Sequence, residues 1–175
     1  MNGRMTVELL RYWWRQSGER LDRRLEGLSD AEYLWEPVDD CWTVHPDPAA
    51  PDRWTYPYEF DPPPPTPFTT LAWRLVHITA GNVIYWEHAF GPGERNFPDL
   101  PVPSTAADAI KAWRDSRQPV TAWLENTDDL ALAEPRPSHL GDPKPAGEVI
   151  QILLNEEIHH GAEIALLRDL YVRLY

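Results

Sequence analysis

Residues 155–163 read Asn-Glu-Glu-Ile-His-His-Gly-Ala-Glu and set charged side chains inside an apolar helical pattern. Glu156 and His160 are four residues apart, so on a helix they turn by about 400°, rise by about 6 Å and face the same way. Polar groups on an inward-facing stripe are costly unless they are hydrogen-bonded or bound to an ion. The spacing therefore predicts a pair of metal ligands.

His77 is a third candidate ligand. It shares a helical face with Trp73 and Ile84, where a histidine on its own is more often a hydrogen-bonded core residue. Glu156 and His160 interrupt an apolar stripe in the same way on another helix. Together the two imidazoles and the carboxylate form a set that leaves coordination positions open on zinc, nickel or iron. A buried hydrogen-bonded network of the same residues is the alternative interpretation.

Spacing excludes two common metalloenzyme motifs. A zincin carries His-Glu-x-x-His, and Asn155 stands where its first histidine would be. A di-iron bundle carries Glu-x-x-His on two helices, whereas only the last helical segment contains that spacing. A single ion is therefore favoured. His159 is turned by about 100° from His160 and cannot serve the same ion from the same helix face.

The other histidines have weaker cases as ligands. His88 lies on the face of His77 but about 16 Å further along the axis, which is too far for a shared ion. We expect it at a surface or an interface. His45 and His139 lie in Pro-rich loops, where we expect no role in chemistry.

Four helical segments must position the candidate ligands. They span residues 7–25, 70–90, a stretch from the N-cap Ser104 to about 124, and 147–174. Gly27 and Gly91 mark the ends of the first two segments, and Pro119 is expected to kink or split the third. No segment alternates as a strand would. The prediction is an all-α, four-helix bundle with a long Pro- and aromatic-rich loop between helices 1 and 2.

That loop, residues 41–67, holds nine prolines, four of them in the run 62–65. It also carries five aromatic residues: Trp42, Trp54, Tyr56, Tyr58 and Phe60. Disorder favours segments poor in aromatics, so we expect an ordered cover over the metal end of the bundle. A Pro-rich recognition strand for another protein is the rival interpretation. Residues 130–145 are expected to form a second irregular crossover.

Composition limits the partners and the compartment. The 175 residues suit a single domain, residues 1–175, and the formal net charge of −12 argues against nucleic acid or an anionic membrane. Cys41 is the single cysteine, so no intrachain disulfide can form and a cytoplasmic location is expected. Asp39 and Asp40 beside it raise a thiol pKa, which disfavours a nucleophile. The start of the chain lacks the apolar region of a signal peptide.

Several stretches, in this order, resemble the DinB-like superfamily. They are residues 28–30 and 34–37, residues 67–77 ending in His77, residues 81–82 and 85–88, and the pattern Glu156-x-x-His159-His160. The resemblance implies a four-helix bundle with a divalent metal, commonly zinc or nickel, bound by His77, Glu156 and His160. The superfamily usually has histidine at the position of Glu156, and glutamate there looks like the branch of the mycothiol-dependent maleylpyruvate isomerase.

The resemblance also implies a function. The superfamily includes thiol S-transferases, so we expect a metal-dependent thiol S-transferase or isomerase that uses a low-molecular-weight thiol against a small electrophile. Of the 16 basic residues only Lys111 and Lys144 are lysines, which suggests a GC-rich genome and, with Glu156, a mycothiol-like thiol. Homodimers are common in the superfamily. A non-catalytic metal- or small-molecule-binding protein and a metal-dependent hydrolase are the alternatives. Catalytic and thiol-binding residues stay unassigned, because residues 159–163 depart from the usual His-His-Arg-Gly-Gln.

Overall fold

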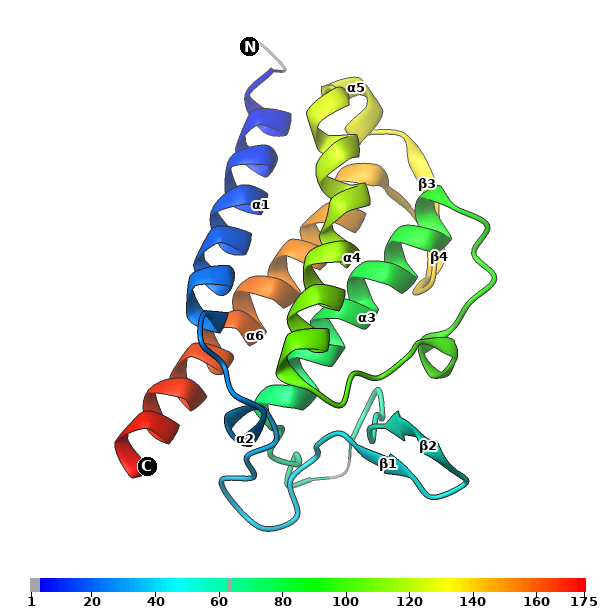
Figure 1. Ribbon diagram of the computed structural model, residues 1–175. Coiled ribbons are helices and arrows are strands. Elements are labelled where there is room, and N and C mark those ends of the chain that lie inside the picture. The colour runs from blue at the N-terminus through cyan, green and yellow to red at the C-terminus, as the bar shows by residue number, and fades with distance from the viewer. Residues whose placement is uncertain (1–3, 63) are drawn as a thin grey trace.

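Four long helices dominate the computed structural model, which describes residues 4–62 and 64–175 (Figure 1). Residues 1–3, and Pro63 of the proline run, lie outside the described residues. The elements in chain order are α1 (Arg4–Leu25), α2 (Asp30–Tyr33), β1 (His45–Asp47), β2 (Ala50–Thr55), α3 (Leu71–Phe90), the short 3-10 helix η1 (Phe97–Asp99), α4 (Ala106–Asn126), α5 (Asp129–Leu132), β3 (Pro135–Ser138), β4 (Gly141–Pro145) and α6 (Ala146–Leu174).

The long helices α1, α3, α4 and α6 form a bundle in which α1 and α6 run one way and α3 and α4 the other (Figure 1). Contacts between α1 and α6 step forward together along both helices, from Ser17–Glu157 to Arg24–Ala165. Helices α3 and α6 are antiparallel, because His77 contacts Glu156 whereas the earlier Arg74 contacts the later Glu163. The part of α6 around Glu156 and Glu163 therefore lies against the first two turns of α3.

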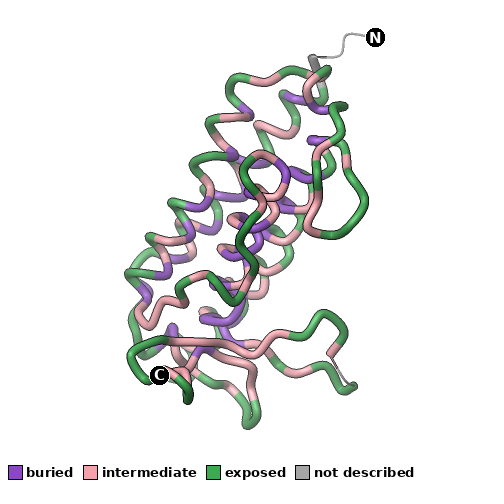
Figure 2. The backbone as a smooth tube through the Cα atoms, turned by 90° about the vertical axis from the view of Figure 1, so that its right-hand side faces the viewer, coloured by how far each residue is buried: buried purple, intermediate pink, exposed green. Residues whose placement is uncertain are grey.

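The core follows the helical stripes that the sequence predicts. Buried residues line the inside of the bundle along its length, while exposed residues cover the outside (Figure 2). One cluster gathers around Leu75, Ile78, Trp113 and Ile164, and the other around Trp14, Val120 and Leu153. Burial of these apolar side chains drives the association of the helices. A polar residue on the same stripes is therefore held in place by packed neighbours.

Local signals explain where the helices that carry the candidate ligands begin and end. The side chain of Thr70 caps α3 by accepting a hydrogen bond from the amide of Trp73. Gly91 follows the last residue of α3, as predicted. Gly27, with a φ of 69°, adopts the left-handed conformation just after α1, which glycine tolerates best. The predicted ranges of the helices agree with the observed ones within about three residues.

Two hairpins correct the expectation that the chain has no strand. β1 pairs with β2, and β3 pairs with β4, each in an antiparallel two-stranded sheet. The strands contain several prolines and do not alternate between apolar and polar residues, so they lack the usual signal of a strand. The expected irregular crossover at residues 130–145 instead consists mainly of α5 and the β3–β4 hairpin.

Helix α4 differs from the prediction at two positions. Its N-cap is Thr105, whose hydroxyl accepts from the amide of Asp108, and Ser104 is not the cap. Of the two outcomes expected at Pro119, a kink or a split, the split is wrong, because the helix continues to Asn126. Pro119 is exposed, so the carbonyl that loses its hydrogen bond can be hydrated without breaking the bundle.

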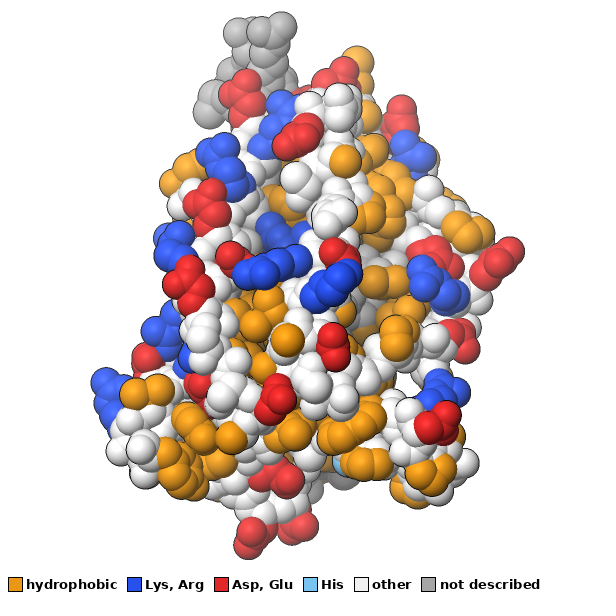
Figure 3. All heavy atoms as spheres, in the orientation of Figure 1, with side chains coloured by type: hydrophobic (Ala, Val, Ile, Leu, Met, Phe, Trp, Pro, Cys, Tyr) orange, Lys and Arg blue, Asp and Glu red, His pale blue; other side chains and the backbone are white. Residues whose placement is uncertain are grey.

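Charges of both signs are interspersed over the face formed by α1 and α4 (Figure 3). Arg114 pairs with Asp22 there, and Arg15 lies beside Glu19. No continuous basic surface that could neutralise phosphates is present on this face. Among the described helices, none is both long enough and apolar enough to span a membrane.

Candidate metal centre

Helix α3 and the Pro-rich segment, residues 41–67, hold His77 by stacking. The His77 ring stacks on Trp73 with centroids 4.8 Å apart and planes 13° apart, and on Tyr58 with centroids 5.7 Å apart. Trp73 is itself fixed, because its indole nitrogen donates to the carbonyl of Pro57 at 2.7 Å. Trp73 and Tyr58 also stack on each other, with centroids 6.4 Å apart, so the three rings form one stacked group that restricts the His77 ring.

Helix α6 supplies Glu156 and His160 on successive turns. Glu156 Oε2 lies 3.2 Å from His77 Nε2 and 3.4 Å from His160 Nε2. One ligand atom from each of the three residues lies within 4.8 Å of the others. The side chains of His77 and His160 are 15 % and 14 % exposed, and that of Glu156 is 33 % exposed. The cluster is therefore mostly enclosed but open on the side of the carboxylate.

The donor set fits a divalent ion. Ligands about 2.0–2.1 Å from a tetrahedral zinc ion lie roughly 3.4 Å from one another. The two nitrogen–oxygen separations of 3.2 and 3.4 Å are close to that value. Two imidazole nitrogens and one carboxylate oxygen are also ligand types used in catalytic zinc sites, which leave a further position open. The three residues form a candidate metal-binding cluster.

Electrostatics within the cluster keep the carboxylate ionised. Contacts with His160 and His77 hold the pKa of Glu156 far below its usual range, despite partial burial. For His160, burial acts to lower the pKa, but the hydrogen bonds to Glu156 and Glu163 outweigh it and the pKa is raised. A metal ion needs the neutral imidazole, so its binding would release a proton.

The Pro-rich segment lies at this end of the bundle, as predicted. Besides Tyr58 on His77, its Trp54 and Tyr56 line a cavity of about 620 Å³ together with Phe97 and His139. Tyr58 stacks on Phe97 as well as on His77, with centroids 5.5 Å apart. The ring of Tyr58, which also lines the cavity, therefore lies between the cavity and His77.

The remaining sequence candidates lie outside the cluster. His88 is half-buried and its Nε2 lies 3.0 Å from the carbonyl oxygen of Arg95. His139 packs against His88 with centroids 4.7 Å apart, and His45 lies in β1. Burial, with Glu36 and Asp39 nearby, raises the pKa of the Cys41 thiol, in agreement with the prediction that it is no nucleophile.

His159 lies on the solvent side of α6, where its side chain is 63 % exposed. It does not face His77 or Glu156, in agreement with its helical angle. It does belong to a second group, in which ligand atoms of His159, His160 and Glu163 lie within 4.8 Å of one another. Sequence analysis did not anticipate this group.

The sequence also did not reveal the role of Glu157. Its side chain is fully enclosed and accepts hydrogen bonds from Ser17 Oγ at 2.5 Å, from Trp113 Nε1 at 3.2 Å and from Arg117. It therefore joins α1, α4 and α6 at the centre of the bundle. Its angle on the helix, about 100° from Glu156, is the signal that could have separated the two carboxylates.

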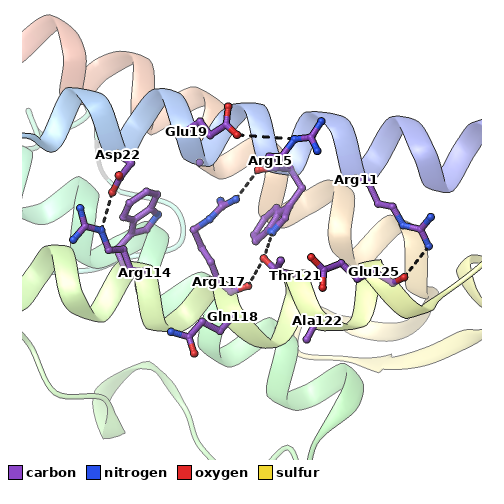
Figure 4. A pocket seen from close by; sticks show the side chains of 13 residues that line it. Arg11, Arg15, Glu19, Asp22, Arg114, Arg117, Gln118, Thr121, Ala122 and Glu125 are labelled. Atoms are coloured by element: carbon purple, nitrogen blue, oxygen red, sulfur yellow. Dashed lines mark hydrogen bonds and ion pairs between the residues drawn. The ribbon is translucent and has the colours of Figure 1, made fainter.

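A groove of about 640 Å³ between α1 and α4 lies over this network (Figure 4). Its arginines are engaged within the fold: Arg117 reaches Glu157, Arg114 pairs with Asp22, and Arg11 donates to the carbonyl of Thr127. None of the three clustered residues lines it. The groove is separate from the candidate metal centre.

The fold and the cluster define a helical bundle with a candidate metal site between its second and last long helices. The sequence model of the DinB superfamily matches residues 14–164, and the chain belongs to this superfamily. A crystal structure of a DinB-like protein from Bacillus cereus is similar, with a TM-score of 0.58, 18 % identity, and coverage of 88 % of this chain and 85 % of that chain. A comparison with curated proteins gives no match.

Proposed function

We propose that the protein is a divalent-metal-dependent thiol S-transferase or isomerase that acts with a low-molecular-weight thiol on a small electrophile. The observation that carries the proposal is the convergence of His77, Glu156 and His160, with one ligand atom each within 4.8 Å. Three ligands leave a coordination position for a thiol sulfur. Zinc and nickel suit this mixed nitrogen and oxygen set and also accept sulfur.

A divalent ion at this site would supply the positive charge that keeps a thiol deprotonated near neutral pH. The two histidines and the carboxylate would hold the ion, and the ionised Glu156 would reduce its net charge. The stacked rings around His77 would exclude water from one side of the site. Position, charge and a partly dry pocket are what the chain itself contributes.

The neighbouring cavity supports a small organic substrate. Its volume of about 620 Å³ lies within the range of small-molecule sites. Tyr58 and Tyr85 lie near Glu156, and burial raises the pKa of both phenols, that of Tyr85 to about 12. Both therefore remain protonated and can donate hydrogen bonds to an anionic group of a substrate. A mycothiol-like thiol is the proposed cosubstrate.

The test is a thiol-dependent turnover assay on protein of known metal content. Zinc- and nickel-loaded protein is incubated with mycothiol, glutathione or bacillithiol and a panel of small electrophiles. Loss of free thiol reports S-transfer, and conversion of the electrophile reports isomerisation, since an isomerase regenerates its thiol; His160→Ala is the inactive control. The proposal is supported if the protein turns over with at least one thiol and this turnover is absent in the His160→Ala control. Metal uptake without turnover favours a non-catalytic binding protein, and thiol-independent hydrolysis favours a hydrolase.

We also propose a cytoplasmic homodimer that uses the outer faces of α1 and α6. Trp13 and Ile158 are 44 % and 50 % exposed, and both line a groove of about 420 Å³ between these helices. Exposed apolar patches of this kind commonly mark protein contacts. Light scattering coupled to size exclusion should give twice the mass of 20.2 kDa, and Trp13→Glu should return the monomer. A wild-type monomer at micromolar concentration would contradict this.

A further inference from the structure

Glu163 links His160 to a buried arginine. Its Oε2 lies 2.7 Å from His160 Nδ1 and 3.0 Å from Arg74 Nε, and its Oε1 lies 3.5 Å from His159 Nε2. The side chain of Arg74 is only 10 % exposed. The carboxylate therefore contacts the nitrogen of His160 that points away from Glu156.

A second ion bound by His159, His160 and Glu163 is one interpretation of this arrangement. Arg74 argues against it, because its charged guanidinium lies 3.0 Å from Oε2 of the carboxylate that such an ion would share. A second ion would also have to take Nδ1 of His160 while Nε2 serves the first. The positive charge that Glu163 requires is already supplied by Arg74.

We propose instead that Glu163, held by Arg74, is a positioning residue for His160. A neutral imidazole carries one proton, and the nitrogen with the better acceptor keeps it. Glu163 is 2.7 Å from Nδ1, whereas Glu156 is 3.4 Å from Nε2. The proton therefore stays on Nδ1, and the lone pair of Nε2 faces His77 and Glu156. This inference rests on the metal centre proposed above.

The two histidines of the cluster are thus held by different means. Stacking on Trp73 and Tyr58 restrains His77, and its Nδ1 has no hydrogen-bond partner in the described part of the chain. His160 makes edge-to-face contacts with Trp73 and His77, at centroid distances of 6.1 and 5.0 Å, and its ring orientation depends on Glu163. Loss of Glu163 should therefore weaken the site without removing a ligand.

Zinc affinity provides the first test. Outer partners of metal-bound histidines typically contribute about 10–100-fold to affinity, so competition with a chromophoric chelator should show a loss of this size in Glu163→Ala. Glu163→Gln keeps the size of the side chain and an acceptor oxygen, and should lose less. Glu148→Gln removes the same charge from an exposed position on the same helix, and should bind zinc like the wild type. Wild-type affinity in both Glu163 variants would overturn the proposal.

The tautomer of His160 provides a second test that needs no metal. In metal-free protein at a pH where the imidazole is neutral, nitrogen-15 shifts should place the proton on Nδ1 in the wild type and in Glu163→Gln. In Glu163→Ala the two tautomers should mix. A wild-type proton on Nε2 would overturn the proposal. If the wild type takes up no zinc, the proposed function fails, and the tautomer alone decides the role of Glu163.

Discussion

Glu156 and Glu157 are adjacent in sequence, and replacing each by alanine should have opposite consequences. The Glu157 side chain is fully enclosed and faces Arg117, whose side chain is 11 % exposed. Removing one partner of a buried ion pair costs about 3–5 kcal/mol, because the other charge is left without compensation. Glu157→Ala should therefore lower the free energy of unfolding by about that amount, a large part of the roughly 5–15 kcal/mol of a typical protein.

Glu156→Ala should behave differently in the same experiment. Its side chain is 33 % exposed, so solvent screens its contacts with His77 and His160. In metal-free protein the loss should be about 1 kcal/mol or less. The same variant should fail to take up zinc or nickel, whereas Glu157→Ala, where it is folded, should still bind the ion.

Urea unfolding of chelator-treated protein, followed by circular dichroism and tryptophan fluorescence, measures both free energies. Glu157→Gln provides a variant that keeps the side-chain volume and an acceptor for Trp113, and it should lose less stability than the alanine variant. A Glu157→Ala protein within about 1 kcal/mol of the wild type would refute the reasoning on the buried network. So would a Glu156→Ala protein that is the less stable of the two.

Three further predictions concern the metal centre and its surroundings. Glu156→His should retain one ion per chain by metal analysis and change the rate of thiol-dependent conversion of the electrophile, because one negative charge is removed beside the ion. The folded-state pKa of His160 is raised above its usual 6.5, so the stability that protonated His160 contributes to metal-free protein should be complete below about pH 6.5 and lost as the pH rises through the raised pKa. Urea titrations at several pH values should show this loss of stability, and the pH dependence should disappear in His160→Gln. Tyr58→Ala should weaken zinc binding several-fold and raise the KM for the electrophile, since it frees the His77 ring and opens the cavity wall; an unchanged zinc affinity and KM would argue against this role.

Helical periodicity carried most of what could be predicted about the fold and the cluster. The apolar stripes of α1, α3, α4 and α6 follow from spacings of three and four residues, because one face of each helix must be buried. The same spacing places Glu156 and His160 on one face and turns His159 away. These inferences depend only on the geometry of a single helix.

Features that depend on two helices could not be read in this way. Arg74 and Glu163 are 89 positions apart in the chain, and their contact follows from the crossing of α3 and α6. Glu157 was recognisable as polar, but its partner Arg117 comes from α4. The β1–β2 and β3–β4 hairpins escaped prediction because their prolines mask the pattern of a strand.

Metal content with ligand variants tests the central claim most directly. Untagged protein, expressed with zinc and nickel and then titrated after chelation, should bind about one divalent ion per chain by elemental analysis. His77→Ala, Glu156→Ala and His160→Ala should each abolish binding, while His159→Ala and Cys41→Ala should keep the wild-type stoichiometry. The account is contradicted if the wild type takes up no ion, or if binding survives the loss of His160 and disappears with His159.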